Sequence, residues 1–335
     1  MPIDLAPLGD AHRLLLQVEL QALQGSRFQP TGFPNLGPAL YRGPGSDDLL
    51  LVESAQSMAN RLEGVCWDEV ADDWVKTLRG IPLVKVRDSA GRPMTNSVLD
   101  SHRLNSSYIL DAQGQDGSNS PFVAIISERL SAIAPNGPVK IPELAKFVFC
   151  YCPNSLLHGV FFANRPHNER IGGGRLRLAR VLSSFIEASG VRIAASGGVK
   201  IDRQDASGKT DGGSAETGYG NVPFPREEFT AESIIAYFNL DLAQLRGYGL
   251  GGAAVRFMVV FAFYKIRALM ERGLRLRTAC DLAPVGDGLI ATAPAGYALP
   301  ELAELEAEMP QLIEAVAAEG LFAEPRVTTV VYRKK

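Results

Sequence analysis

The chain of 335 residues is long enough to bury a large core, and its 46% hydrophobic and 21% charged residues are typical of a soluble globular protein. A net charge of −3, taken alone, argues against a nucleic-acid-binding protein. The charges are unevenly distributed, however. Residues 165–209 hold nine Lys/Arg against four Asp/Glu, residues 256–277 hold six against one, and residues 301–319 are acidic. The near-neutral total therefore hides two basic regions, each of which also fits an ordinary solvated face.

The N-terminal third alternates apolar runs with polar loops. Arg13–Leu20 and Leu49–Glu53 predict buried strands, with a short helix as the alternative for the first. Gly25–Tyr41 holds three prolines and three glycines, so it is neither a helix nor a central strand. Ser54 is a suitable N-cap for the helix that follows it, and Glu69–Leu78 is expected to continue helical.

The middle of the chain predicts mainly helices and then strands. Asn96–Asp111 is helical or mixed, and helices are expected at Phe122–Ser131 and Pro142–Tyr151, the second with proline in its first turn. Gly114–Ser120 is a polar loop, and Asn164–Gly174 is a basic, glycine-rich one. Strands are expected at Leu156–Ala163, Leu178–Ala188 and Val191–Ala194.

A projecting arm is expected over Gly197–Thr230. Two extended flanks, Val199–Asp202 and Asn221–Phe224, enclose a tip of Gly, Ser, Asp and Thr that has few apolar side chains to bury. Basic and amide groups lie at its base, so the arm could reach over a nucleic-acid backbone and a neighbouring subunit. The simpler alternative is a polar surface loop without a binding role. We expect shortening of the tip, Ser207–Ala215, to be tolerated.

The C-terminal third contains the clearest helices. Ser233–Leu245 has competing strand and helix signals, whereas Ala253–Arg272 predicts a helix that is apolar on nearly all faces and therefore lies in the core. Leu274–Thr278 predicts a strand, Pro300–Glu319 an acidic amphipathic helix and Val327–Arg333 a final strand. Interleaved strands and helices with long insertions fit an α+β fold with an open, ferredoxin-like sheet.

Catalytic and metal-binding motifs are missing from the sequence. None of the four cysteines forms a CxxC pair, none of the four histidines has metal-ligand spacing, and no GxSxG, Walker or HExxH motif occurs. We therefore expect reduced thiols in a cytoplasmic protein without metal or cofactor. The N-terminus does not resemble a signal peptide, and the longest apolar run of the C-terminal half is too short to span a bilayer, so no membrane association is expected.

Several clusters of polar and basic side chains suit nucleic-acid binding instead. The loop from Gly25 to Gly37 combines phosphate donors with aromatic rings, and polar groups crowd the helix start at Ser54, although simple capping needs only that serine. On a strand, Arg275 and Arg277 lie on one face, where they need an anion or an acidic partner such as Asp281 or a glutamate.

Long stretches of the sequence resemble one CRISPR family. The stretches GSRFQPTGFPNLGPALY and LLLVESAQSMANRLE, followed by SHRLNSSYI, NSLLHGVFFA, SSFIEASGV, SGGVKID, GYGNVPFPREEFT and GLRLRTACDL, are similar to the Cas-seven-type backbone subunit of type I-G (formerly I-U) effector complexes, in the RAMP superfamily. The tip Ser207–Ala215 carries no motif of the family. The matches otherwise spread over nearly the whole chain.

This resemblance implies a single elaborated domain over residues 1–335. It would have a modified ferredoxin-like or RRM-like palm, a mainly helical insertion (fingers) over residues 65–155 and a thumb β-hairpin over residues 197–230. Copies of such a subunit assemble in a helical row along one guide RNA (crRNA), together with a large subunit and an RNA-end-binding or processing subunit. The protein holds the RNA backbone and leaves the bases free to pair with a target DNA strand, while strand cutting belongs to a separate enzyme.

Mapped onto this sequence, the resemblance implies a set of residues that contact the guide RNA. Most of them would face its phosphates and sugars, whereas Val222 and Phe224 would wedge against a displaced base. The set comprises Arg27, Gln29, Thr31, Ser54, Gln56, Asn60, Arg61, His102, Arg103, Asn105, Lys200, Asn221, Val222, Phe224, Arg226, Arg275 and Arg277.

Two other functional classes compete with this hypothesis. A RAMP endoribonuclease would use His102 or His158 as a general acid or base, although a lone histidine is more often structural. A metabolic α/β enzyme would carry no nucleic acid. The ultraviolet absorbance ratio and the size of the purified protein would separate the latter from a filament subunit.

Overall fold

The computed structural model describes residues 2–333 except 34, 36, 46–47, 114–139, 164–174, 204–206, 208–219 and 287. Its centre is an eight-stranded antiparallel sheet in the order β16-β17-β1-β15-β12-β5-β4, with β18 paired to β1 beside this path. The strands are β1 (Arg13–Ala22), β4 (Leu40–Arg42), β5 (Asp48–Glu53), β12 (Leu182–Ser189), β15 (Ser233–Asp241), β16 (Leu274–Arg277), β17 (Cys280–Pro284) and β18 (Ile290–Ala293).

One face of this sheet is covered and the other is open. Side chains alternate between buried and partly exposed along β1, β12 and β15, as expected for a sheet with one face on the core. On the open face Phe185 stacks on Tyr237, its cross-strand neighbour. The sequence periodicity of these strands therefore reports directly which side chains enter the core.

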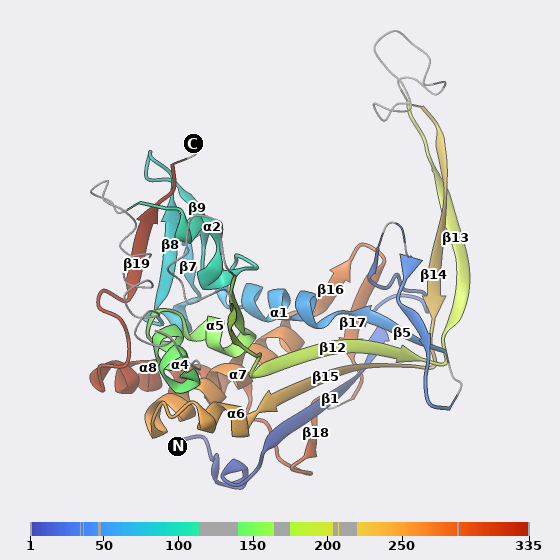
Figure 1. The fold of residues 1–335 in the computed structure, drawn as a ribbon. Coiled ribbons are helices and arrows are strands. Elements are labelled where there is room, and N and C mark those ends of the chain that lie inside the picture. Colours follow the sequence, from blue (N-terminus) through green and yellow to red (C-terminus); the bar gives the residue numbers. More distant parts are fainter. Residues whose placement is uncertain are drawn as a thin grey trace.

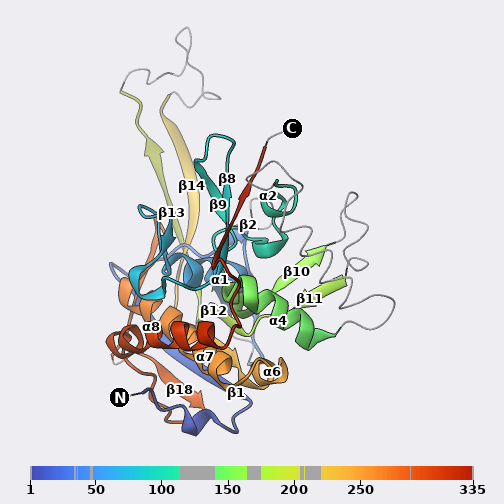
Figure 2. The same cartoon turned by 90° about the vertical axis from the view of Figure 1, so that its left-hand side faces the viewer.

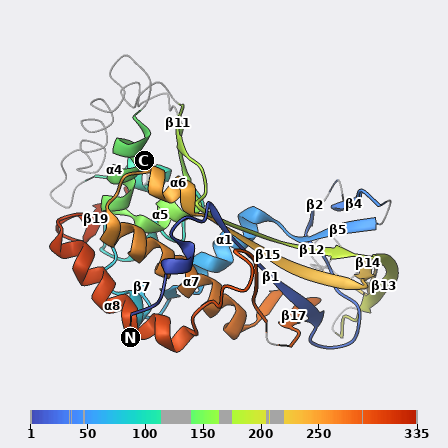
Figure 3. The same ribbon diagram turned by 90° about the horizontal axis from the view of Figure 1, so that it is seen from below.

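Helix α7 (Gly252–Arg272) forms the centre of the core, as Figure 3 shows from below. Fourteen of its residues are buried, because α1 (Ala55–Gly64) and α8 (Leu302–Ala318) pack against it. Short elements complete this region: the 3-10 helices at Ala6–Leu8 and Lys76–Leu78, and α6 (Leu242–Gly247). In the part of the chain that the structure describes, no helix is long and apolar enough to cross a bilayer.

A separate three-stranded sheet forms a head beside the helices (Figure 2). Its middle strand β8 (Leu83–Arg87) pairs in antiparallel fashion with β9 (Pro93–Asn96) and in parallel with β19 (Val327–Val331) from the far end of the chain. Around the head and the helices lie β6 (Trp67–Asp68), β7 (Asp73–Trp74), the 3-10 helix Arg103–Asn105, α2 (Ser107–Leu110), α4 (Ile141–Tyr151), α5 (Pro153–His158), β10 (Val160–Ala163) and β11 (Arg175–Leu178).

A long two-stranded hairpin leaves the central sheet on the same side as the head (Figure 1). Its strands, β13 (Arg192–Lys200) and β14 (Val222–Thr230), pair in antiparallel register from Arg192–Thr230 to Lys200–Val222. Helix α1 and strand β16 lie between the head and the hairpin, and the small hairpin β2 (Gly32–Phe33) and β3 (Gly37–Pro38) lies near the hairpin base. The molecule is thus U-shaped, with α1 along the floor of the U.

Most predicted elements are confirmed, and the architecture is α+β. The predicted strands at Arg13–Leu20, Leu49–Glu53 and Leu274–Thr278 and the predicted helices at Ala253–Arg272 and Pro300–Glu319 are present with small shifts of their ends. The competing signals over residues 233–245 resolve into a strand followed by a short helix. The helix expected at Phe122–Ser131, the loops over 114–120 and 164–174 and most of the arm tip lie outside the described residues.

Two predictions about local structure are wrong. Glu69–Leu78 does not form an α-helix, because the Asp68 side chain accepts hydrogen bonds from the backbone N–H groups of Val70 and Ala71 and turns the chain into the β6–β7 pair. Only Lys76–Leu78 forms a turn of 3-10 helix. Leu156–His158 belongs to the buried helix α5 rather than to a strand, which begins at Val160. A short apolar run does not distinguish a buried helix from a buried strand.

The insertion over residues 65–155, expected to be mainly helical, holds both strands and helices where the structure describes it. From 65 to 113 the chain forms four short strands, two single turns of 3-10 helix and one short α-helix. Strands β6 and β7 pair with each other, whereas β8 pairs with β9 and with β19, which lies more than 200 residues away and is not indicated by the local sequence. Helices do occupy the described residues from 141 to 155. The division into a single domain with fingers and a thumb stays a prediction.

Candidate nucleic-acid interface

The base of the hairpin is fixed to the loop that follows β1. Phe28 and Phe229 exchange two backbone hydrogen bonds of 2.9 Å, and both rings are buried. Gln29 N–H donates to the Ala279 carbonyl at 2.7 Å and Thr31 N–H to the Val52 carbonyl at 3.0 Å. Prolines on the loop suit this path, because they need no further backbone donor. The loop therefore holds Arg27, Gln29 and Thr31 in defined positions beside β14.

Glu228 on β14 is a buried carboxylate between two of the predicted arginines. Arg226 Nη2 bonds one carboxylate oxygen, and Arg27 Nη1 lies 3.5 Å from the other. Arg226 and Glu228 are two residues apart on a strand, so their side chains share one face. The side chains of Arg27 and Arg226 remain 57% and 35% exposed, so both stay accessible to a ligand.

Glu53, at the end of β5, is the centre of a second cluster of the same kind. Its fully buried carboxylate accepts from Arg61 Nε at 3.0 Å, from the Arg277 guanidinium and from the Ser57 hydroxyl. Arg277 also donates to the Gln29 carbonyl at 2.8 Å. Arg61 donates to the Leu276 carbonyl at 2.6 Å, which joins α1 to β16.

These two clusters give the hairpin base a net positive charge despite the buried acids. Each carboxylate balances one of its two arginines, so one positive charge per cluster remains to attract an anion. The side chains of Arg61 and Arg277 are about a quarter exposed. Exposed Arg275 adds a positive charge, whereas Asp281 opposite it on β17 and exposed Glu227 add two negative charges, so the positive excess at the hairpin base is small. Guanidinium groups that are already oriented lose less freedom on binding a phosphate, which favours backbone recognition.

Two clefts at the hairpin base collect six of the predicted residues. A cleft of about 680 Å³ is lined by Gln29, Thr31, Arg226 and Arg277, among others. A second cleft of about 480 Å³ is lined by Arg27, Glu228 and Arg275. The predicted set therefore comes together here from a loop, a hairpin strand and a sheet edge that are far apart in sequence.

Helix α1 carries the next predicted group. Ser54 is its N-cap and accepts from the Ser57 N–H at 3.3 Å, which confirms the predicted capping. Gln56 and Asn60 are exposed and lie one helical turn apart, so they share the solvent face of α1. They do not line the clefts at the hairpin base, but they lie on the helix that forms the floor of the U.

The upper hairpin presents a different surface. The ring of Phe224 is 46% exposed and lies over Gly198, its cross-strand neighbour, where an added Cβ would come 3.2 Å from the ring. Lys200 is exposed and pairs with Val222 across the hairpin, and only the backbone of Val222 is described. Asn221 accepts from the Asp202 N–H at 2.8 Å and so joins the ends of the two strands.

Arg103, expected to face a guide phosphate, is buried instead. Glu63 binds it through two hydrogen bonds of 2.7 and 3.0 Å, and the third guanidinium nitrogen donates to the Gly159 carbonyl at 3.3 Å. Its role is therefore structural, and the prediction of a phosphate contact is wrong for this residue. Asn105 is also buried, whereas His102 is exposed beside Asp100. These three residues line a pocket apart from the hairpin base.

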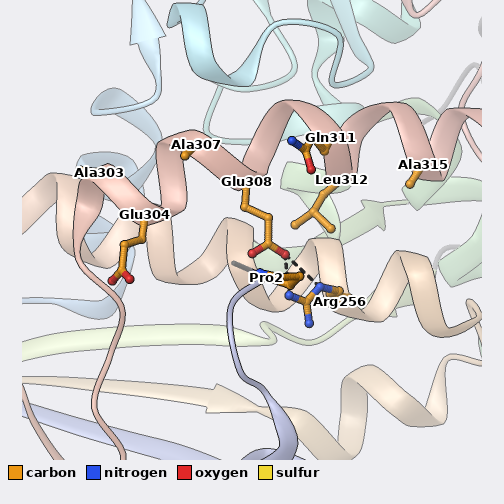
Figure 4. A pocket seen from close by; sticks show the side chains of 9 residues that line it. All are labelled: Pro2, Arg256, Ala303, Glu304, Ala307, Glu308, Gln311, Leu312 and Ala315. Atoms are coloured by element: carbon orange, nitrogen blue, oxygen red, sulfur yellow. Dashed lines mark hydrogen bonds and ion pairs between the residues drawn. The ribbon is translucent and has the colours of Figure 1, made fainter.

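A groove on the other side of the molecule has the opposite character. It occupies about 700 Å³ between α8, α7 and the N-terminal segment, and the Arg256–Glu308 ion pair closes its wall (Figure 4). Glu304 adds a second carboxylate to this groove. Its lining of acidic and small apolar side chains does not suit a phosphate backbone.

The residues that sequence reasoning missed are the acidic ones. Glu53, Glu63 and Glu228 each fix one or two arginines. The sequence analysis expected Asp281 or a glutamate as an acidic partner of Arg275 and Arg277, and Glu53 is that partner for Arg277, but the partners of the other arginines were not expected. A signal was available: Glu53 ends the apolar run LLLV, where a buried charge needs a cationic partner.

Comparison with known proteins places the chain among the CRISPR-associated proteins of the Cas-seven type in the RAMP superfamily. The matching family model is described as CRISPR-associated protein GSU0053 and covers residues 14–193, more than half of the chain, so the chain belongs to this family. The resemblance of the sequence to a CRISPR-associated family is thereby confirmed. No curated protein matches the sequence.

Three solved structures are weakly similar. A chain of a "CRISPR RNA-guided surveillance complex, pre-nicking" is 13% identical, with 90% of this chain and 88% of that chain covered and a TM-score of 0.41. A chain of a "CRISPR RNA-guided surveillance complex" is 14% identical, with 92% and 83% covered and a TM-score of 0.35. Csc2 of Thermofilum pendens is 12% identical, with 94% and 79% covered and a TM-score of 0.32.

Proposed function

We propose that this protein is a guide-RNA-binding backbone subunit of a type I-G CRISPR surveillance complex in cytoplasmic antiviral defence. The observation that carries the proposal is the pair of arginine clusters on Glu53 and Glu228 at the hairpin base. Membership of a CRISPR-associated family supports it. The protein binds the RNA backbone and leaves the bases to pair with a target DNA strand.

The hairpin base provides backbone recognition without base reading. Guanidinium groups of Arg27, Arg226 and Arg277 and the amide of Gln29 are donors suited to phosphate and sugar oxygens. Exposed Gln56 and Asn60 on α1 extend the donor surface toward the head. None of the proposed contacts reads a base edge. The affinity for RNA should therefore depend weakly on RNA sequence and strongly on salt concentration.

The long hairpin acts as the thumb and the central sheet as a modified RRM-like palm. Phe224, with its half-exposed ring, stacks on a displaced base, and Lys200 and Asn221 bind the RNA backbone beside it. The hairpin also carries exposed Ile193 and Val199, which is consistent with its reaching a neighbouring copy of the chain in a helical row. A large subunit and a subunit that binds or processes the RNA end complete the complex.

An RNA titration tests the proposal. Arg27→Ala and Arg275→Ala remove exposed guanidinium groups, so they should weaken binding of single-stranded RNA and lower the slope of log K against log salt by about 0.7 for each lost phosphate contact. Arg79→Ala, an exposed arginine beside α8, is the matched control. If affinity and slope are the same in all three variants and the wild type, the assignment is wrong.

The subunit is proposed to be non-catalytic. His158 is 1% exposed, whereas His102 is exposed and is therefore the stronger candidate for a nuclease. Incubation with labelled repeat RNA in the absence of metal separates the two functions. Cleavage at a defined position that disappears in His102→Ala would replace the proposal by an endoribonuclease.

A further inference from the structure

A basic pocket lies across α1 from the hairpin base and has no part in the clusters on Glu53 and Glu228. It measures about 500 Å³, and its walls come from residues 101–105, the end of α5, β10 and the segment after β11. His158, Arg177 and Arg180 are among the residues that line it. Neither arginine belongs to the set predicted from the sequence.

The charges around this pocket are mostly positive. Arg177 is exposed, and Arg180 is half-buried with one nitrogen donating to the Ala55 carbonyl at 2.6 Å. Behind the wall Lys265 is fully buried and bonds the Asn154 side chain at 2.8 Å and the Leu62 carbonyl at 3.2 Å rather than a carboxylate. Glu63 balances Arg103, and Asp100 lies at the rim beside His102, so cations outnumber carboxylates.

His158 gives an independent sign that a ligand belongs here. It is 1% exposed, and among the described residues neither of its ring nitrogens has a hydrogen-bond partner. Buried polar groups are normally paired, and an exception calls for a water, an ion or a ligand. Burial lowers the pKa of His158 well below its usual value, and the charges of Lys265, Arg103 and Arg180 lower it further.

The backbone brings the two walls together closely. Gly159 has φ +80°, and an added Cβ would lie 2.9 Å from the Leu178 carbonyl oxygen and 3.1 Å from the Arg180 N. Only glycine permits this approach. The contact holds the backbone of Arg180 beside His158, so the pocket does not depend on flexible side chains alone.

We propose that this pocket binds a phosphate group of a nucleic-acid backbone, which rests on the proposed function at the hairpin base. Arg177 and the unused nitrogens of Arg180 donate to the phosphate oxygens, and the neutral imidazole of His158 donates through its one N–H. Helix α1 contacts both sites, through Arg61 on one side and through Ala55 and Glu63 on the other. The backbone therefore crosses the exposed face of α1, past Gln56 and Asn60.

Histidine ring spectra of the full-length protein test the pocket directly. Inorganic phosphate should shift the signals of His158 and His102 with one saturable midpoint and leave that of exposed His12 unchanged, with His158→Gln as the assignment variant. Arg177→Gln should weaken phosphate binding several-fold, whereas the control Arg79→Gln should not. An unshifted His158 signal, or equal phosphate affinity in Arg177→Gln and wild type, overturns the proposal.

A salt titration identifies the source of the phosphate. In Arg177→Gln the salt slope should fall by about 0.7 with single-stranded guide RNA if the guide supplies the group. A fall seen only after the target DNA strand is added assigns the phosphate to that strand. No fall in either case overturns the proposal.

The outcomes also separate the two sites. If Arg275→Gln lowers the slope and Arg177→Gln does not, the hairpin-base function stands and the second pocket fails. If phosphate shifts His158 in a protein that binds no RNA, the pocket is a phosphate site, but its assignment to a nucleic-acid backbone fails together with the proposed function.

Discussion

Replacing Glu53 by Gln should destabilise the protein measurably, because this carboxylate is shared by two arginines. Removing one partner of a buried ion pair costs about 3–5 kcal/mol when the remaining charge is stranded in the interior. Here Arg61 and Arg277 are 26% and 23% exposed, so water solvates part of the freed charge. The amide also keeps a hydrogen bond to Ser57. We therefore expect a loss of about 2–3 kcal/mol in the free energy of unfolding.

Urea denaturation of wild type and Glu53→Gln measures this loss, and an unchanged m-value shows that the folded state alone is affected. The double variant Glu53→Gln/Arg277→Gln should lose less than the sum of the two single variants by about 1 kcal/mol, since both remove the same interaction. A loss below about 0.5 kcal/mol, or strictly additive effects, would refute the view that Glu53 organises the cluster.

Three further predictions concern other parts of the molecule. Gly159→Ala should lower the free energy of unfolding by about 1–3 kcal/mol, because Gly159 has a positive φ and an added Cβ would contact the Leu178 carbonyl oxygen. The control Gly64→Ala in α1, with open space around it, should leave stability unchanged or raise it, and denaturant unfolding measures both variants. Phe224→Ala should change stability by less than about 0.5 kcal/mol, because the ring is half-exposed, yet weaken RNA binding by about 1 kcal/mol or more in an anisotropy titration; unchanged affinity would remove it from the RNA site. His158 stays neutral in the folded protein, whereas the unfolded imidazole takes up a proton below about pH 6.5. In phosphate-free buffer the free energy of unfolding should therefore fall as pH drops from 7 to 5, by up to about 1.4 kcal/mol per pH unit more in the wild type than in His158→Gln. Parallel pH profiles of the two proteins would contradict this.

Sequence patterns predicted the elements whose periodicity is long and uninterrupted. The apolar helix over Ala253–Arg272 and the alternating strand at Arg13–Leu20 could be predicted without tertiary information. The hydrophobic pattern of each segment indicates burial on all faces of the helix and on alternate positions of the strand. The head was not predictable in this way. Its strand Leu83–Arg87 is stabilised by residues 327–331, and no local pattern indicates a parallel partner at that distance.

The candidate site likewise combines features that local sequence indicates with features that only tertiary contacts determine. Arg27, Arg226 and Arg277 were expected to bind RNA because of their residue type and the motifs around them, and the structure brings them to one place. Their common anchors, Glu53 and Glu228, follow from three-dimensional contacts between a loop, a hairpin and a sheet edge. Arg103 was misassigned for the same reason, since its partner Glu63 lies 40 residues earlier on a helix.

The parallel pairing of β8 with β19 has a consequence for the order of folding during synthesis. The central sheet and α7 are complete once residue 293 has been made, but β8 has only β9 beside it until residues 327–331 appear. Through that interval β8 exposes one unpaired, apolar edge, the kind of edge to which a strand of another chain adds. Strand β19 therefore also covers an edge of β8 that stays open to aggregation until residues 327–331 have been made, and chaperone dependence should be greatest just before β19 emerges from the ribosome.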